Sequence, residues 1–195
     1  MNVTGLSIAD EAIQAALDKV AAKGGDTAPM MADIEGAMLF DVQRRFETET
    51  DPAGQSWQRM SKRTAASRAR RKRRKADDET PVTPKLLRDT NRLYSSIQGH
   101  SGEGFAEVGT NLAYARIHQE GGVIEQYPHS RKVRFRKVEG RILFARKAHK
   151  RAFEKPVTYG ARTITIPARP YLGFSDAVRA KILGIIEEHF GEGLQ

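Results

Sequence analysis

Apolar residues recur at helical spacing in the first half of the chain and again at its end. An interval of four predicts a core helix, capped by Asp26 or Thr27, whose apolar positions are Ile34, Met38, Val42 and Phe46. Weaker apolar stripes predict a peripheral helix over residues 7–23 and another helix over residues 83–97. A last helix is predicted after Ser175, which caps it; its apolar positions are Val178, Ile182, Ile185 and Ile186.

After residue 100 the pattern changes to short runs typical of strands. These runs are Phe105–Thr110, Lys132–Val138, Arg141–Phe144 and Arg162–Ile166, the middle two joined by a turn at Glu139 and Gly140. A run of helices followed by a run of strands predicts an α+β fold, with helices packed on one face of a mainly antiparallel sheet. With 195 residues, the chain is expected to form one domain over residues 1–195, with a peripheral helix in residues 1–25.

The formal net charge of +9 comes from one short segment. Residues 62–75 hold nine basic and no acidic residues, which leaves 24 basic against 24 acidic residues elsewhere. Like charges on every helical face repel one another, so residues 61–80 are expected to be a mobile basic insertion. Three interpretations stay open: a solvated loop, a contact to DNA phosphates, or a contact to an acidic protein surface. The candidate contact residues are Lys62, Arg63, Arg68, Arg70, Arg71, Lys72, Arg73, Arg74 and Lys75.

The sequence offers no arrangement of residues typical of catalysis. It has no cysteine, and its five histidines are scattered without metal-ligand spacing. No catalytic residue, metal site or cofactor is therefore predicted, and the chain is not expected to be an enzyme. A nuclease, the enzymatic alternative, would need a carboxylate cluster, for which Asp77, Asp78 and Glu79 lack a partnering motif. No run approaches the roughly 20 apolar residues that span a bilayer, so no membrane partner is expected.

Two segments, Val108–Gly122 and Ile166–Ser175, concentrate histidine, arginine, tyrosine, glycine and proline. The first predicts a short helix that ends at Gly121. The histidine in it suits a packed, hydrogen-bonded position or a subunit contact, and the arginine of the second segment suits solvent or an interfacial carboxylate. Tyr171 and Leu172, which follow this arginine, suit either the core or an interface. The candidate interface residues are Tyr114, His118, Arg169, Tyr171 and Leu172.

Four segments in order resemble the phage virion morphogenesis family, the tail completion proteins of contractile-tailed phages. They are RFETETDPAGQSWQRMSKRT (45–64), KLLRDTNRLYSSI (85–97), VGTNLAYARIHQEGG (108–122) and IPARPYLGFS (166–175). The chain departs from the family pattern at Asn91, where Gly is usual, and at Glu120, where an aromatic residue commonly stands. Asn tolerates a left-handed backbone, so the turn at position 91 is expected to persist.

The resemblance implies a non-enzymatic protein that completes the tail at its head-proximal end and enables head–tail joining. From this role we predict a ring of identical subunits, a hexamer to match the tube, that contacts tail tube or terminator proteins, head connector proteins and, through phosphates, packaged DNA. The expected location is the host cytoplasm during assembly and then the head–tail junction of the virion. The alternative is a stand-alone basic nucleic-acid-binding protein.

Overall fold

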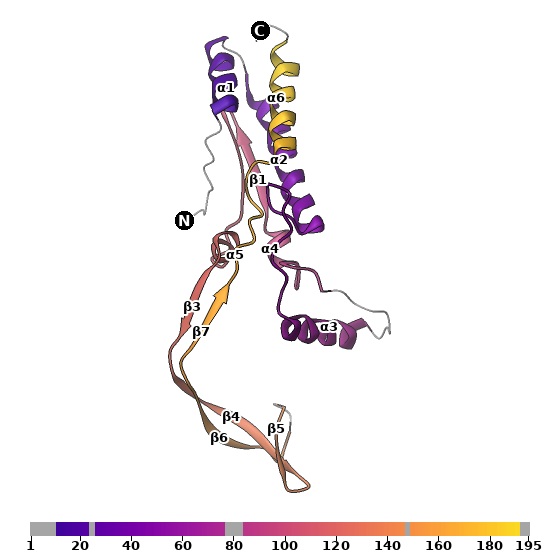
Figure 1. Ribbon diagram of the computed structural model, residues 1–195, viewed down its shortest axis with the longest axis vertical. Coiled ribbons are helices and arrows are strands. Elements are labelled where there is room, and N and C mark those ends of the chain that lie inside the picture. The colour runs from indigo at the N-terminus through magenta and orange to yellow at the C-terminus, as the bar shows by residue number, and fades with distance from the viewer. Residues whose placement is uncertain (1–10, 24–25, 77–83, 147–148, 192–195) are drawn as a thin grey trace. The chain divides into compact units, whose positions relative to one another are not determined.

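The computed structural model describes residues 11–23, 26–76, 84–146 and 149–191 (Figure 1). The α+β class expected from the sequence is confirmed. The chain divides into two compact units, which we call unit 1 and unit 2. Unit 1 comprises residues up to Gly121 and from Pro167 onwards, and unit 2 comprises Gly122–Ile166. This division into compact units does not test whether residues 1–195 form one domain, which stays a prediction.

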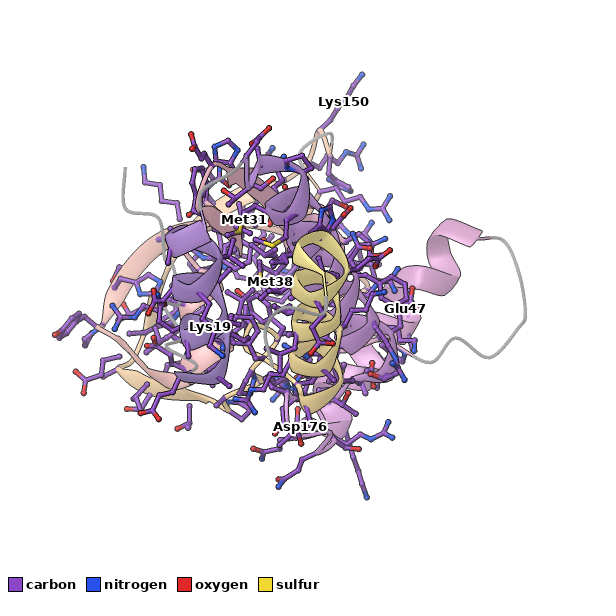
Figure 2. The ribbon with its side chains drawn as sticks, turned by 90° about the horizontal axis from the view of Figure 1, so that it is seen from above. Lys19, Met31, Met38, Glu47, Lys150 and Asp176 are labelled. Carbon is purple, nitrogen blue, oxygen red and sulfur yellow. The ribbon has the colours of Figure 1, made fainter. Side chains whose placement is uncertain are left out.

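Three helices pack together in one part of unit 1. They are α1 (Glu11–Lys23), α2 (Ala28–Thr48) and α6 (Asp176–Phe190), and α6 packs against both α1 and α2. The apolar stripes meet in one buried cluster of Ile13, Val20, Met30, Met31, Ile34, Val178, Ile182, Ile185 and Ile186. Figure 2 shows Met31 and Met38 between α1 and α6. The predicted caps are observed in part: Ser175 Oγ accepts a hydrogen bond from Val178 N, and Asp26 accepts one from Ala28 N.

A hairpin lies against α2 in the same unit. Its strands, β1 (Gln98–Gly102) and β2 (Phe105–Gly109), pair antiparallel, and both contact α2. A hydrogen bond of 2.6 Å from Ser101 Oγ to Glu35 Oε2 ties the hairpin to the helix. The hairpin therefore has a helix on one face, as the α+β pattern predicts.

A second apolar cluster surrounds Phe46 near the end of α2. The Phe46 ring meets those of Trp57, Tyr94 and Tyr171 with centroids 5.8, 5.6 and 5.2 Å apart. Two short helices border this cluster, α4 (Arg92–Ser95) and α5 (Ala115–Glu120). Its buried residues are Val42, Phe46, Trp57, Leu86, Leu93, Ile97, Ala115, Tyr171 and Leu172. The cluster joins segments that lie far apart in sequence, including both glycine- and proline-rich segments.

Unit 2 consists of strands. The pair β3 (Gly122–Gln126) and β7 (Arg162–Ile166) forms one antiparallel sheet. A second sheet has β4 (His129–Val138) at its centre, between β5 (Arg141–Phe144) and β6 (Phe153–Tyr159). Within the described residues the strands thus form three small antiparallel sheets, where the sequence suggested one.

The basic insertion is the main local correction. Residues expected to form a loop instead form helix α3 (Lys62–Ala76). Ser61 begins this helix, because its Oγ accepts a hydrogen bond from Thr64 N at 3.2 Å, and Ala and Arg favour helix. Arg68 and Arg71 also meet the carboxylate of Asp89, which offsets part of the repulsion along the helix.

Two other predictions differ from the structure in extent. Within residues 84–97 only α4 is helical, although Leu86, Leu93 and Ile97 are buried as expected. Asn91 begins α4 with φ of 58°, so the left-handed backbone expected at this position is confirmed. Residues 1–10, which include the start of the expected peripheral helix, and residues 77–83, which include Asp77, Asp78 and Glu79, lie outside the described residues.

Candidate functional site: a cationic pocket beside a basic helix

Helix α3 presents its basic side chains mainly to solvent. Lys62, Arg63, Arg70 and Arg71 are exposed, and Arg68 is partly buried. Lys72, Arg73, Arg74 and Lys75 continue the helix, but their side chains lie outside the described residues. Arg68 turns inward, where Nη1 donates to the carbonyl of Lys85 at 3.3 Å and Nε lies 3.8 Å from Asp89 Oδ2. One side of α3 is therefore anchored, while most of its described cations stay available to a partner.

A pocket of about 250 Å³ lies beside the anchored side of α3. Its lining comes from α3, the segment after Pro84, α5 and the segment after Pro167, all in unit 1. The lining residues are Met60, Arg68, Leu86, Leu87, Asp89, Thr90, Leu93, Tyr114, His118 and Arg169. The structure thus brings together three predicted interface residues, Tyr114, His118 and Arg169, with one residue of the basic run, Arg68.

Arg169 is held in the pocket wall by backbone groups. Its side chain is 8% exposed, and its Nε donates to the carbonyl of Gln58 at 3.0 Å. Its backbone N–H donates to the carbonyl of His118 at 2.8 Å, which fixes the two residues side by side. Burial lowers the pKa of Arg169, the charge of Arg68 adds to this effect, and Glu49 opposes it. The arginine expected in solvent or at an interface is thus largely withdrawn from solvent.

His118 faces a positive environment. Burial lowers the pKa of His118, and the charges of Arg169 and Arg68 lower it further. Its ring meets that of Tyr114 edge-on, with centroids 5.9 Å apart. Its Nδ1 is buried and has no hydrogen-bond partner among the described residues. The His118 ring is therefore packed in a site that disfavours its charged form, without a hydrogen bond from its Nδ1 to a described residue, and a subunit contact through this histidine stays a prediction.

Tyr171 and Leu172 belong to the core of unit 1. Their side chains are 1% and 7% exposed, which favours the core alternative over an interface. The Gln119 amide holds this segment: Oε1 accepts from the backbone N–H groups of Tyr171 at 2.9 Å and Leu172 at 3.0 Å, and Nε2 donates to the Leu172 carbonyl at 3.0 Å. Burial raises the pKa of Tyr171 to about 12, and its hydroxyl donates to the Ala115 carbonyl at 3.3 Å. Of the two alternatives expected for these side chains, burial favours the core, and a contact with another subunit stays a prediction.

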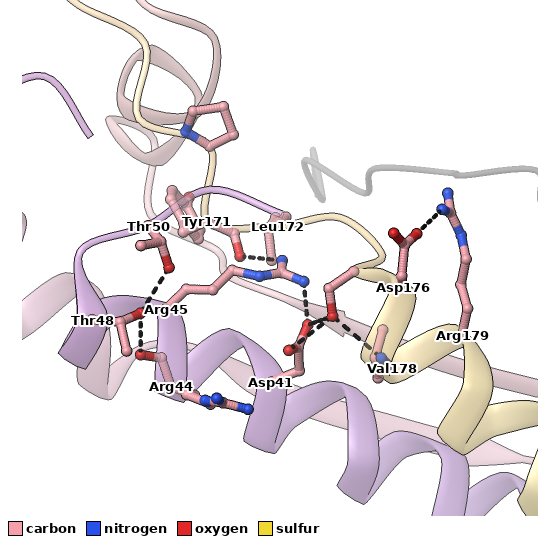
Figure 3. A network of polar contacts seen from close by, with 12 residues as sticks. Asp41, Arg44, Arg45, Thr48, Thr50, Tyr171, Leu172, Asp176, Val178 and Arg179 are labelled. Atoms are coloured by element: carbon pink, nitrogen blue, oxygen red, sulfur yellow. Dashed lines mark hydrogen bonds and ion pairs between the residues drawn. The ribbon is translucent and has the colours of Figure 1, made fainter. Parts of the chain in front are cut away.

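A buried polar network that the sequence did not suggest holds the other side of this segment (Figure 3). Arg45, 3% exposed, donates from Nη1 to the Tyr171 carbonyl at 3.0 Å and pairs through Nη2 with Asp41. Asp41 also accepts from Ser175 Oγ at 3.1 Å, next to the cap of α6. Burial lowers the pKa of Arg45 and Asp41 opposes the shift. An arginine on the apolar side of the α2 pattern is the one sequence signal that indicates this network.

Unit 2 is a second basic region, which the even charge balance outside residues 62–75 concealed. It holds twelve Lys or Arg against three Asp or Glu, a net charge of +9. The remainder, outside both regions, holds twelve basic and 21 acidic residues. The interpretation that residues 62–75 carry all the excess positive charge was therefore wrong. The excess of +9 in unit 2 and the excess of −9 in the remainder cancel in the net charge of the chain outside residues 62–75.

The described residues offer no metal centre and no membrane span. No group of three or more His, Cys, Asp or Glu side chains within them is placed to hold a metal ion. In the same part of the chain, no helix combines the length and apolarity needed to cross a membrane. What the geometry does provide is a cationic pocket, a basic helix and a basic sheet unit, which suit binding to anionic groups.

Comparison with known proteins gives a consistent assignment. The chain is 28% identical over 178 residues to "Mu-like prophage FluMu G protein 2" of Haemophilus influenzae, covering 91% of this chain and 88% of that protein. It is 24% identical over 184 residues to "Putative capsid assembly protein G" of Escherichia phage Mu, covering 94% and 91%. No solved structure matches. The model of the phage virion morphogenesis family matches residues 8–191. The chain therefore belongs to the phage virion morphogenesis family and has a structural or assembly role in a phage, in a family that is not a known enzyme class.

Proposed function

We propose that this protein acts at the head-proximal end of the phage tail, where it completes the tail and enables head–tail joining. Membership of the virion morphogenesis family supports an assembly role, and the name of the Mu relative associates that protein with capsid assembly. The observation that carries the proposal is helix α3, which is anchored through Arg68 and Arg71 to Asp89 and exposes further cations. An anchored basic helix suits docking to an acidic connector surface or to the phosphates of packaged DNA.

In this proposal the working form is a ring of identical subunits, a hexamer matching the tail tube. Its partners are tail tube or terminator proteins on one side and head connector proteins on the other. The subunits assemble in the host cytoplasm and end at the head–tail junction of the virion. The pocket residues Tyr114, His118 and Arg169 stay candidates for subunit contacts, because Tyr114 is exposed at the pocket rim.

Complementation of a phage that lacks this protein tests the proposal. The variant is Lys62→Gln, Arg63→Gln and Arg70→Gln, which removes three exposed charges and leaves Arg68 and Arg71 on Asp89. We expect full heads and separate tails to accumulate. The matched control removes three exposed charges elsewhere, at Arg44, Arg92 and Lys181, and is expected to restore infectious particles. If both variants restore particles equally, α3 has no part in joining.

Duplex DNA binding separates the two candidate partners of α3. Phosphate contacts release counterions, so each one contributes roughly 0.9 to the slope of log K against log salt, and nine contacts approach about 8. The α3 variant should therefore lower the slope by about 3 if its three cations meet phosphates. A slope near zero for the unchanged protein excludes DNA and favours the acidic connector surface.

The second candidate function is a stand-alone nucleic-acid-binding protein. The observation that favours it is the net charge of +9 in unit 2, which gives the chain two separate basic regions. Under this alternative the isolated monomer binds duplex DNA tightly at physiological salt, and phage particles join without the protein. Weak monomer binding combined with a joining defect supports the tail function instead.

A further inference from the structure

Unit 2 has no core of its own. None of its described residues is buried, although it contains eight of the eleven large apolar side chains that are exposed in the described chain. Small two- and three-stranded sheets without a buried face are marginally stable in water. Contiguous exposed apolar surface in a folded protein marks an interaction site. The eight side chains, which lie on both faces of the two sheets, are Val123, Ile124, Tyr127, Val138, Ile142, Leu143, Phe144 and Phe153.

The strand register gathers aromatic and basic side chains on one face of the β5–β4–β6 sheet. Phe135 on β4 stands opposite Phe144 on β5 and Phe153 on β6, with ring centroids 5.3 and 6.2 Å apart. Alternation along β4 places Lys137 and Arg131 on the same face as Phe135. Phe144 is 75% exposed, so the ring cluster is open to solvent. The face therefore has an apolar centre surrounded by cations. Protein interfaces commonly have an apolar centre and a polar rim, and a cationic rim suits an acidic partner.

The rest of the chain supplies the opposite charge. Outside unit 2 and residues 62–75 there are twelve basic and 21 acidic residues, an excess of −9 that equals the excess of +9 in unit 2 in magnitude. On α1, α2 and α6, seven exposed acidic side chains outnumber three exposed basic ones, and Phe40 on α2 is 67% exposed. The exposed acidic residues are Glu11, Asp18, Asp33, Glu47, Asp176, Glu187 and Glu188. A second copy of this chain therefore offers unit 2 both acidic and apolar surface.

We propose that unit 2 docks on the acidic helical surface of unit 1 in a second copy of this chain. Contact between two copies of unit 2 would bring together two surfaces that each have a net charge of +9, and the repulsion between them disfavours it. Phosphates would match the cations but would leave aliphatic side chains such as Ile142 and Val123 uncovered. A contact between two different surfaces is head-to-tail, and such contacts close into rings when the rotation permits. The inference rests on the ring assembly proposed above and assigns its interface.

Sedimentation velocity of the full chain, at low and high salt over a range of protein concentration, tests the proposal. We expect the unchanged protein to self-associate, and high salt to weaken the association. Ile142→Ser with Phe144→Ser, two exposed positions on β5, should weaken it at least tenfold in Kd. Lys137→Glu with Arg131→Glu, on the same face as Phe135, should do the same by reversing charge. The matched control, Arg63→Glu with Arg70→Glu, makes the same charge change on α3 and should leave the Kd unchanged.

The outcomes separate this inference from the ring proposal. If the unchanged protein never self-associates, both are overturned. If it associates but the unit 2 variants associate equally well, the ring stands and the docking inference fails. Cross-links between unit 2 and helical residues in a mixture of isotope-labelled and unlabelled chains must join different chains; cross-links confined to single chains overturn the inference. Variants that lose duplex DNA binding while keeping the oligomer would make unit 2 a DNA-binding surface instead. Retained circular dichroism of unit 1 helices in each variant shows that folding is intact.

Discussion

Gln119→Ala removes the amide that holds the Tyr171–Leu172 segment, and we expect a large loss of stability. The Gln119 Oε1 accepts from two backbone N–H groups, at 2.9 and 3.0 Å, and Nε2 donates to one carbonyl at 3.0 Å. Leaving a buried donor without its acceptor costs about 1–3 kcal/mol. Two part-buried donors near the lower half of that range give a loss of about 2–4 kcal/mol in the free energy of unfolding.

Urea unfolding followed by tryptophan fluorescence measures this loss. Trp57, the chain's single tryptophan, lies in the same buried cluster as Tyr171, so its signal reports on the part of unit 1 that Gln119 holds. Glu120→Ala, at the next position, is the control, because Glu120 pairs with Arg116 at the surface of α5. If Gln119→Ala unfolds at the same urea concentration as the Glu120→Ala control, the clamp is not an important contributor to stability.

Three other predictions concern the same core. Arg45→Met should lower the free energy of unfolding by about 3 kcal/mol or more, because it leaves Asp41 without its buried partner, whereas the exposed neighbour in Arg44→Met should change it little. Trp57→Ala should cost about 3 kcal/mol or more, since the ring is 4% exposed and its Nε1 donates to the Pro170 carbonyl; unfolding followed by circular dichroism checks this, and a small loss would mean the site collapses around the change. The folded-state pKa of His118 is lowered, so the contribution of this histidine to stability is complete above its unfolded pKa, near 6.5, and is lost as pH falls through the folded pKa. In urea titrations over a range of pH, His118→Gln should therefore reduce the loss of stability on the acid side. An unchanged dependence of stability on pH would contradict the burial of this ring.

Local signals determined the parts of the fold that were predicted well. These signals are the apolar residues at every fourth position of α2, the Ser175 cap of α6 and the Glu139–Gly140 turn. Each depends on interactions within a few residues, so the sequence alone is enough to predict it. Asn91 is a further local case, because a left-handed backbone depends on the residue itself. The order of four motifs carried the family assignment, which the family model confirms.

Long-range contacts decided what the sequence left open. Helix α3 forms where repulsion predicted a loop, and Asp89, distant in sequence, neutralises part of its charge. The strands β1, β3 and β6 lack a strong alternating pattern, and each is defined by its antiparallel partner. The cluster around Phe46 likewise assembles from segments more than 100 residues apart, which no local pattern reveals.

The sequence by itself determined the main helices, the α+β class, the family and a basic segment. Only the tertiary structure decided that Tyr171 and Leu172 lie in the core, that His118, Arg169 and Arg68 share one pocket, and that unit 2 exposes its apolar side chains. The physical reason is that caps, turns and apolar periodicity depend on neighbouring residues, whereas burial and the pKa of a side chain depend on whichever distant segments pack against it. The net charge of the whole chain likewise conceals the basic unit 2, because the acidic excess of the residues outside unit 2 and residues 62–75 cancels it in the sum.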